Sequence, residues 1–197
     1  SLRMIAGFEW PTEGEVYIEG KAMGHTPPFQ RKVNTVFQSY ALFQHLTVYQ
    51  NIAFGLEMEG AQKEEIEKRV KHVLEMVQLT GMERRKPKQL SGGQQQRVAI
   101  ARTLAMNPEA ILFDEPTSAL DPRTTAEVIS VMTDLAASGQ RMIVVTHAMS
   151  FARTVAHQVH ILHAGRIAES GPPEQIFGDP KESITREFLS EAGERRA

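Results

Sequence analysis

The chain has 197 residues, of which 41% are hydrophobic and 23% charged, and its formal net charge is -2. This length suits one domain, with or without a small inserted lobe, and the composition is that of a globular protein. The charge argues against nucleic acid as the main partner, because phosphate backbones are usually bound by a clear cationic excess. The absence of cysteine excludes disulfide scaffolds and thiolate metal sites. No apolar run approaches the roughly 20 residues that span a bilayer.

The N-terminal part of the chain shows one helical fragment and two strand signals. Leu2–Gly7 reads as the inside of a helix, without an initiator Met or a signal peptide, so we expect an N-terminally truncated fragment. Alternation over Glu15–Glu19 predicts a short strand followed by a turn, and Val33–Phe37 is a second strand candidate. From Lys63 to Val77, apolar residues recur at helical spacing and predict an amphipathic helix.

The middle of the chain alternates helices with apolar runs. Gln94–Met106 reads as a helix with Ser91 as its N-cap. The runs Ala110–Asp114 and Met142–Thr146 fit strands that are buried on both faces of a parallel sheet. Because the helix around Thr124–Ala137 lies between them, the order strand, helix, strand implies a right-handed parallel crossover and an α/β class.

The last part of the chain contains a small hairpin signal, with Val159–Leu162 and Arg166–Glu169 flanking a turn. Strand signals are weak between residues 39 and 105, and this stretch is mostly helical. We therefore expect a single domain made of a sheet core, about residues 1–38 and 106–197, and an inserted helical lobe, about residues 39–105.

The strongest chemical signal is Leu90-Ser91-Gly92-Gly93-Gln94 at the start of a helix. Glycines allow a phosphate to approach the backbone closely, Ser91 adds a hydroxyl donor, and the helix N-terminus supplies N–H groups and a positive dipole. The motif therefore suits an anion. The alternative is that Ser-Gly-Gly only caps the helix.

Polar side chains follow each of the three strands expected in the sheet core. Asp114 and Glu115 end one buried strand, where open α/β sheets bind ligands. Asp114 suits Mg²⁺ through water, and Glu115 suits the polarisation of a water that attacks a γ-phosphate. Gln38 and His147 follow the other two strands and would face the same crevice. Taken alone, a histidine such as His147 is more often structural than catalytic, and Gln38 is unremarkable.

Taken in chain order, these residues resemble the motifs of the ATP-binding cassette (ABC) ATPase family. The matches are Gln38 with the Q-loop, Leu90–Gln94 with the signature sequence, Ile111–Glu115 with Walker B, Ser118–Asp121 with the D-loop, and His147 with the switch histidine. The order and spacing of five motifs make the resemblance specific, and it extends from Leu2 to about Leu189.

The resemblance implies a P-loop NTPase (RecA-like) sheet core and an ATPase that uses ATP and Mg²⁺. It assigns catalytic roles to Glu115, His147 and Gln38, nucleotide binding to Ser91, Gly92, Gly93, Gln94 and Asp121, and metal binding to Asp114 and Gln38. It also implies a second ATPase subunit in a homodimer, transmembrane permease subunits, an extracytoplasmic substrate-binding protein, and no nucleic acid. Such a subunit lies peripherally on the cytoplasmic face of a bacterial membrane.

One family motif is missing from the sequence. The phosphate loop Gly-x-x-Gly-x-Gly-Lys-Ser/Thr normally lies immediately before a stretch like Leu2–Gly7, and no such loop is present. Without its lysine and its nest of N–H groups, the β- and γ-phosphates lose most of their ligands. We therefore expect the chain as given to bind ATP poorly and not to hydrolyse it. A non-catalytic truncated cassette, and a soluble ABC ATPase of DNA repair or translation, remain alternatives to the importer subunit.

The sequence gives mixed signals about the kind of importer. The downstream half, including Phe113–Pro122 and Thr146–Arg153, resembles polar amino-acid importers. The upstream half, with Ala6–Glu9 and Phe54–Leu56, resembles polyamine, sugar or iron importers, which usually carry an additional C-terminal β-domain. Because no such domain follows in this sequence, we expect a polar amino-acid importer, with the polyamine, sugar or iron type as the alternative.

Overall fold

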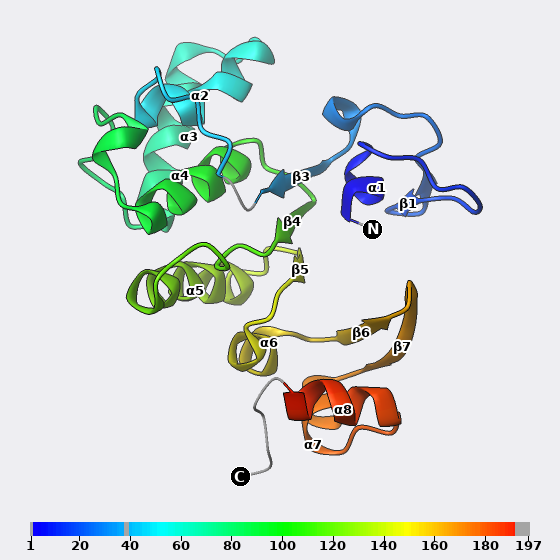
Figure 1. Ribbon diagram of the computed structural model, residues 1–197. Helices are drawn as coiled ribbons and strands as arrows, with labels where there is room; N and C mark the ends of the chain where they lie inside the picture. The colour runs from blue at the N-terminus through cyan, green and yellow to red at the C-terminus, as the bar shows by residue number, and fades with distance from the viewer. Residues whose placement is uncertain (1, 38–39, 192–197) are drawn as a thin grey trace. The chain divides into compact units, whose positions relative to one another are not determined.

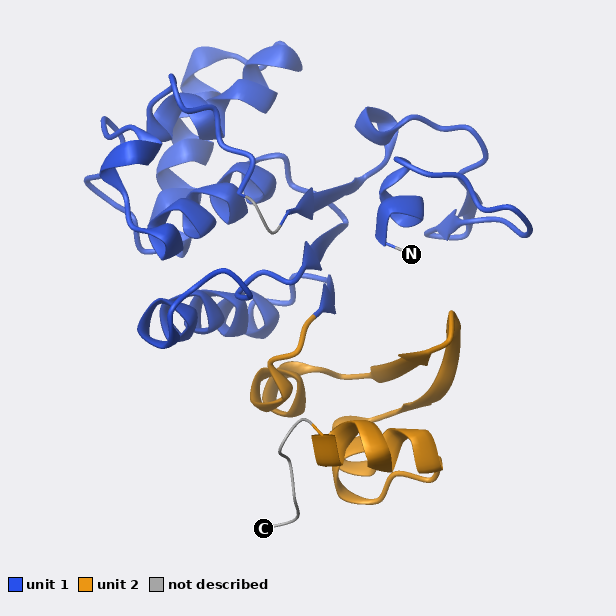
Figure 2. Cartoon of the chain, in the orientation of Figure 1, with its two compact units in different colours: residues 1–145 blue, residues 146–197 orange. Residues whose placement is uncertain are grey.

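The computed structural model describes residues 2–37 and 40–191, which form two compact units, residues 1–145 and 146–197 (Figure 2). The boundary between the units follows the third strand of the sheet, so the lobe expected at residues 39–105 belongs to the same unit as the sheet. The lobe and the sheet form one unit because the last helix of the lobe contacts the first strand of the sheet and the helix that follows the second strand.

A three-stranded parallel sheet lies at the centre of the first unit, in the order β3 (Val33–Val36), β4 (Ala110–Asp114), β5 (Met142–Val145) (Figure 1). All three strands lie within one residue of their predicted ends, and the parallel pairing agrees with the α/β class. The middle strand is the most buried, because its Ile111, Leu112 and Phe113 side chains are all 0% exposed.

The edge strand β5 departs from the expectation that it is buried on both faces. Ile143 and Val145 are each 45% exposed, whereas Met142 and Val144 are partly covered. Because side chains alternate across a strand, every second residue of β5 faces a side that no element of the described sheet covers. An apolar run predicts a strand, but it does not tell which neighbours cover each of its faces.

The N-terminal segment packs as short elements around one buried arginine. These elements are α1 (Leu2–Ala6), β1 (Tyr17–Ile18), β2 (Lys21–Ala22) and a 3₁₀ turn η1 (Pro28–Gln30). The strands β1 and β2 pair as an antiparallel hairpin, in agreement with the strand and turn predicted there.

Arg31 fixes this segment by binding backbone carbonyl oxygens. Its guanidinium donates hydrogen bonds to the Met4, Ile5 and Thr26 oxygens at 2.9, 3.0 and 2.9 Å. The chain turns at Gly7 with a φ of +85°, and a Cβ there would lie 2.6 Å from the Arg31 Nε atom. Only glycine therefore allows the end of α1 to lie so close to the guanidinium.

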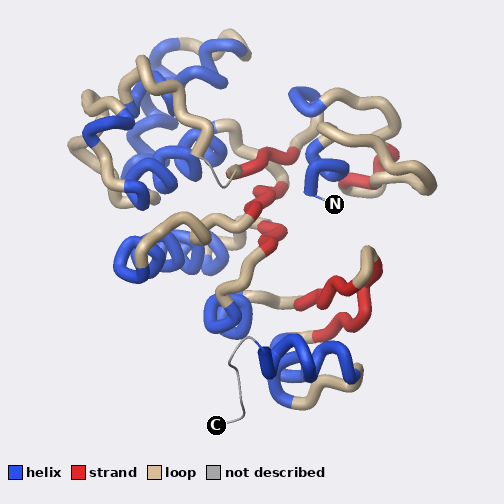
Figure 3. Tube along the Cα trace, in the orientation of Figure 1, coloured by secondary structure: helices blue, strands red, loops and turns tan. Residues whose placement is uncertain are grey.

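The described part of the expected lobe consists of helices and the loops that join them, with no strand between residues 40 and 105 (Figure 3). Its helices are α2 (Val48–Met58), α3 (Lys63–Met76) and α4 (Gly92–Ala105), with a 3₁₀ turn η2 (Pro87–Gln89) before α4. The amphipathic helix predicted from Lys63 is confirmed as α3, whose Ile66, Val70, Val73 and Leu74 are buried. The helix α5 (Pro122–Ala137) then connects β4 to β5.

The second unit contains the predicted hairpin, formed by β6 (Val159–His163) and β7 (Arg166–Gly171). It also contains α6 (Met149–Val155), α7 (Pro173–Gly178) and α8 (Ser183–Glu191). Across both units, none of the helices within residues 2–37 and 40–191 has the length and apolar character needed to cross a bilayer.

Glu169 ties the hairpin of the second unit to the chain between α7 and α8. Its carboxylate accepts hydrogen bonds from the Lys181 and Glu182 N–H groups at 2.9 and 3.1 Å, and from Gln175 Nε2 at 3.1 Å. Glu169 is only 7% exposed. Burial alone would raise the pKa of Glu169, but these hydrogen bonds stabilise the charged form and lower the pKa to about 2.

We predict that Glu169 makes the second unit sensitive to acid. Because the pKa of Glu169 is lower in the folded chain than in the unfolded chain, the unfolded chain binds the proton first. The free energy of unfolding should therefore fall as the pH decreases from about 5 towards 2. Glu169→Gln should lower the free energy of unfolding at neutral pH by about 1–3 kcal/mol and remove that part of the pH dependence.

Chemical denaturation followed by circular dichroism between pH 7 and pH 2.5 measures both effects. The matched control is Glu174→Gln, which removes the same charge from an exposed position in α7. Parallel stability curves for the parent chain and Glu169→Gln would contradict the prediction.

Candidate functional site

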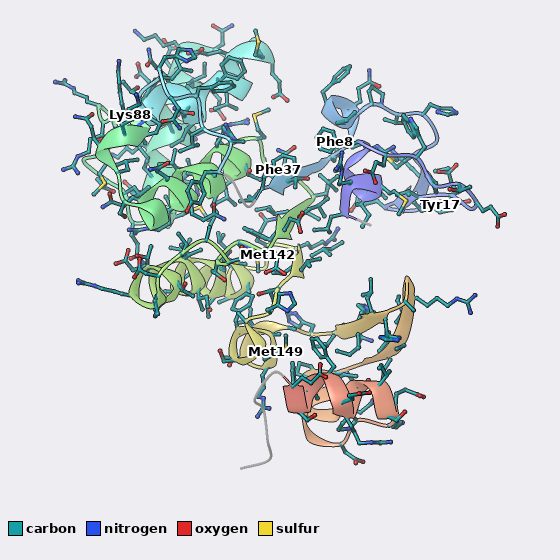
Figure 4. All side chains as sticks on the ribbon, in the orientation of Figure 1. Phe8, Tyr17, Phe37, Lys88, Met142 and Met149 are labelled. Carbon is teal, nitrogen blue, oxygen red and sulfur yellow. The ribbon has the colours of Figure 1, made fainter. Side chains whose placement is uncertain are left out.

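The strand register brings the carboxyl ends of β3, β4 and β5 to one edge of the sheet. Val36 pairs with Phe113, and Asp114 pairs with Val145, so the residues after these pairs leave the sheet at the same edge. Phe37, which follows β3, lies beside Phe8 with the ring centroids 5.8 Å apart (Figure 4). The sequence-based placement of Asp114 at this edge is therefore confirmed.

Of the three predicted catalytic residues, only Glu115 lies in the described part of the first unit. Gln38 lies outside the described residues. His147 lies in the second unit, where it is exposed and comes two residues before α6. The prediction that Gln38, Glu115 and His147 face one crevice stays a prediction.

Glu115 has a strained backbone that the sequence did not reveal. Its φ is +48°, which is uncommon for a residue with a side chain and costs about 1–3 kcal/mol. Three hydrogen bonds hold this conformation: Glu115 N–H donates to the Val145 oxygen at 3.0 Å, and the Ser118 N–H and hydroxyl donate to the Glu115 oxygen at 3.2 and 3.0 Å. Such over-determined strain is concentrated at functional sites.

The carboxylates at this edge suit a magnesium ion that is bound together with phosphate. Asp114 and Glu115 are adjacent and partly buried. Within residues 2–37 and 40–191 there is no cluster of three or more His, Cys, Asp or Glu that would form an all-protein metal cage. Mg²⁺ is usually held by one or two carboxylates, water and substrate phosphates, so the donor set present at Asp114 fits this ion.

The first turn of α4 is closed by a reciprocal capping box. The Ser91 hydroxyl oxygen accepts a hydrogen bond from the Gln94 N–H at 3.2 Å, and the Gln94 Oε1 atom accepts one from the Ser91 N–H at 3.0 Å. The predicted N-cap is therefore confirmed. A serine hydroxyl that accepts one hydrogen bond can still donate its own hydrogen, so capping leaves Ser91 able to bind an anion. The Gln94 side-chain oxygen, in contrast, is already used in the cap.

The space beside the two glycines of this turn is occupied by the chain itself. A Cβ at Gly92 would lie 3.2 Å from both the Tyr40 hydroxyl and Leu120 Cδ2. A Cβ at Gly93 would overlap the Thr124 Cγ2 methyl. The sequence predicts that both glycines allow the close approach of a phosphate. The structure gives a second reason, because a side chain would crowd its neighbours at position 92 and would overlap Thr124 at position 93.

Asp121 is the N-cap of α5 and orients the residue that packs on Gly93. Its Oδ1 atom accepts hydrogen bonds from the Arg123 and Thr124 N–H groups at 3.1 and 3.2 Å, and its Oδ2 atom accepts one from the Thr124 hydroxyl. The hydrogen bond from the Thr124 side chain is the main reason that the pKa of Asp121 is lowered. The assignment of Asp121 to nucleotide binding stays a prediction, and its observed role is structural.

Sequence reasoning gave no signal for Thr124 or for the contact of Tyr40 with Gly92. Neither residue belongs to a periodic pattern or to a motif that identifies its partner. Both contacts join segments that are far apart in the sequence, so only the folded chain reveals them.

The chain is similar to ATP-binding proteins of membrane transporters. A family model described as ABC transporter matches residues 1–118. A spermidine/putrescine import ATP-binding protein of Clostridioides difficile is 43% identical over 193 residues, covering 98% of this chain and 56% of the relative. A protein of the same name from Pseudomonas fluorescens is 46% identical over 191 residues, covering 96% of this chain and 53% of the relative. The chain thus spans about half the length of the curated relatives that it matches.

Solved structures of ATP-binding cassettes have the same fold. The ATP-binding cassette MJ0796, in a dimeric post-hydrolysis state with ADP and phosphate, is 35% identical with a TM-score of 0.74, covering 87% of this chain and 78% of that one. The cbiO1 protein of Clostridium perfringens, part of an ABC transporter complex, is 26% identical with a TM-score of 0.82, covering 96% of this chain and 77% of that one. The expected P-loop NTPase fold is confirmed.

We predict that the contact between Gly93 and Thr124 limits what can occupy position 93. Gly93→Ala should lower the free energy of unfolding by about 1–3 kcal/mol, because the added methyl overlaps Thr124 Cγ2. Thr124→Ser removes that methyl and keeps the hydroxyl that binds Asp121. Adding it to Gly93→Ala should therefore restore most of the loss.

Urea denaturation of the parent and the variants tests this prediction. The matched control is Gly178→Ala, because a Cβ at Gly178 meets no atom within 4 Å. The prediction would be wrong if Gly93→Ala were as stable as the control, or if Thr124→Ser gave no rescue. Either result would mean that the first turns of α4 and α5 are not closely packed at these residues.

Proposed function

The chain belongs to the ABC transporter family, and on that premise we propose that it forms the nucleotide-binding part of an ATP-hydrolysing importer subunit. The observation that carries this proposal is the strained Glu115, held beside Asp114 at the carboxyl end of the central strand. This end of a parallel sheet is where open α/β folds bind their ligands. A carboxylate fixed there suits general-base activation of a water molecule.

The remaining site residues receive roles that their chemistry supports. Asp114 would hold the Mg²⁺ of Mg-ATP through water, and this ion would supply charge neutralisation at the phosphates. Ser91 and the N–H groups of Gly92 and Gly93 bind phosphate at the start of α4, where the helix dipole favours an anion. Gln38 and His147 are proposed as further catalytic residues, with Gln38 also at the metal. Gln94 and Asp121 are proposed to bind the nucleotide.

The proposed assembly contains more than one chain. We infer a homodimer in which the Ser91–Gly93 turn of one subunit meets the nucleotide on the other. The cassette MJ0796, which is dimeric with ADP and phosphate, supports this inference. The permease subunits are proposed as the membrane partners, with an extracytoplasmic substrate-binding protein as an indirect partner, and this places the chain peripherally at the cytoplasmic face of the membrane.

We propose a polyamine such as spermidine or putrescine as the transported substrate, in place of a polar amino acid. Both reported relatives are named as spermidine/putrescine import proteins, which favours the alternative expectation from the upstream half of the sequence. The amino-acid expectation depended on the end of the chain, which carries no information about the substrate. The choice of substrate lies with permease and binding-protein surfaces, so overall similarity is a better guide.

We predict that the protein produced from its complete gene hydrolyses Mg-ATP and that Glu115→Gln lowers kcat by about 100-fold or more. The amide keeps the size of the side chain but cannot accept a proton from water. A phosphate-release assay measures the rate. The matched control is Glu109→Gln, which alters a carboxylate at the opposite end of β4 and should retain turnover. Full turnover by Glu115→Gln would remove the general-base assignment.

We predict that deletion of the gene in its host lowers uptake of labelled spermidine by about tenfold or more, because transport requires a cassette that closes around ATP and then hydrolyses it. Uptake of labelled glutamine should be unchanged. The wild-type gene should restore spermidine uptake, and the Glu115→Gln gene should not. Loss of glutamine uptake with normal spermidine uptake would instead indicate an amino-acid importer.

A further inference from the structure

The Tyr40 side chain reaches the phosphate-binding turn from a distant part of the sequence. Its hydroxyl is located 3.2 Å from the position that a Cβ on Gly92 would take. Tyr40 is partly buried, and this burial raises the pKa of its hydroxyl still further above neutral pH. A neutral hydroxyl group thus lies against the first glycine of α4.

Arg102, near the end of α4, holds the backbone that carries Tyr40. Its guanidinium donates hydrogen bonds to the Ala41 oxygen at 2.7 Å and to the Tyr40 oxygen at 3.4 Å. Tyr40 and Ala41 both have left-handed backbones, with φ of +55° and +47°. Two successive strained residues persist only where the surroundings hold them, and the forked guanidinium supplies this support.

The chain just beyond Tyr40 is held equally firmly against α2. The side chain of Asn51, which is 0% exposed, accepts a hydrogen bond from the Phe43 N–H at 2.9 Å and donates to the Phe43 oxygen at 3.1 Å. The Phe43 ring lies against the Phe54 ring, with the two ring centroids 4.7 Å apart. The Arg102 Cζ atom lies 5.8 Å from the centroid of the Phe43 ring. Residues 40–43 are therefore held between α2 and α4, with Tyr40 directed at Gly92.

We propose that Tyr40 is a positioning residue that transmits displacement of residues 40–43 to the Ser91–Gly93 turn. Its hydroxyl limits how the first turn of α4 can move, and Arg102 fixes the direction from which it acts. The inference rests on the proposed function, because it matters for turnover only if that turn binds the nucleotide. A displaced turn slows the step in which the turn meets the phosphates and leaves the initial binding of Mg-ATP unchanged.

A double-mutant cycle on the protein from its complete gene tests the proposal. The variants are Tyr40→Phe, Gly92→Ala and the double variant, with Tyr49→Phe as the matched control on α2. For each variant, the unfolding midpoint is measured in urea without nucleotide, and kcat and KM are measured with Mg-ATP. The unfolding data report the contact itself, and the split between kcat and KM reports its effect on turnover.

The added methyl of Gly92→Ala crowds the Tyr40 hydroxyl and, at the same 3.2 Å, the Leu120 Cδ2 atom, so we expect Gly92→Ala alone to lower kcat about tenfold with KM nearly unchanged. Removing the hydroxyl relieves the crowding, so the double variant should regain about threefold in kcat and part of the lost stability. Combining Gly92→Ala with Tyr49→Phe should give no recovery.

The failed outcomes are distinguishable. If the wild-type protein hydrolyses no Mg-ATP, the proposed function falls and the role of Tyr40 in turnover falls with it. If the wild type is active but the effects of Tyr40→Phe and Gly92→Ala multiply independently in both assays, only the positioning role is overturned. If the two substitutions are non-additive in the free energy of unfolding but additive in their effect on kcat, the contact has only a packing role. This outcome would also overturn the proposal.

Discussion

The close approach of α4 and α5 at Gly93 and Thr124 is the contact on which the geometry of the candidate site depends. The two first turns can lie this close only because position 93 has no side chain and because Asp121 fixes the Thr124 side chain. The start of α5 is joined to the end of β4 by the tight turn in which Ser118 binds the Glu115 oxygen. This packing contact thereby helps to set the Ser91–Gly93 turn of α4 relative to the carboxylates that end β4.

Three arginines stabilise other parts of the first unit in the same way, because the guanidinium of each donates hydrogen bonds to backbone carbonyl oxygens. Arg31 binds carbonyl oxygens at the end of α1, and Arg102 binds those of the strained Tyr40–Ala41 turn. Arg97, which is 8% exposed, donates to the Val77 and Gln78 oxygens at the end of α3 at 3.3 and 3.4 Å, and pairs with Glu127 on α5 at 3.1 Å. Carbonyl oxygens at helix ends carry partial negative charge, so a guanidinium satisfies several of them at once.

The secondary structure could be predicted closely because its signals are local. The periodic apolar residues of α3, the Ser91 cap and the breakers around β4 each act within a few residues. Burial was predicted less well, because it depends on what lies across each face. The apolar run of β5 resembled that of β4, yet Ile143 and Val145 are half exposed whereas Leu112 and Phe113 are fully buried.

The sequence alone determined the three sheet strands, the C-terminal hairpin, the helices α3 and α4, the Ser91 cap, the family resemblance and the placement of Asp114 at the carboxyl edge of the sheet, because each follows from residue type and short-range spacing. Only the tertiary structure decided that Glu115 is strained, that Thr124 and Tyr40 fill the space beside the two glycines, and that Arg102 supports Tyr40. These features arise where segments distant in sequence meet. They depend on distances of a few ångströms between those segments, and no local sequence pattern encodes such distances.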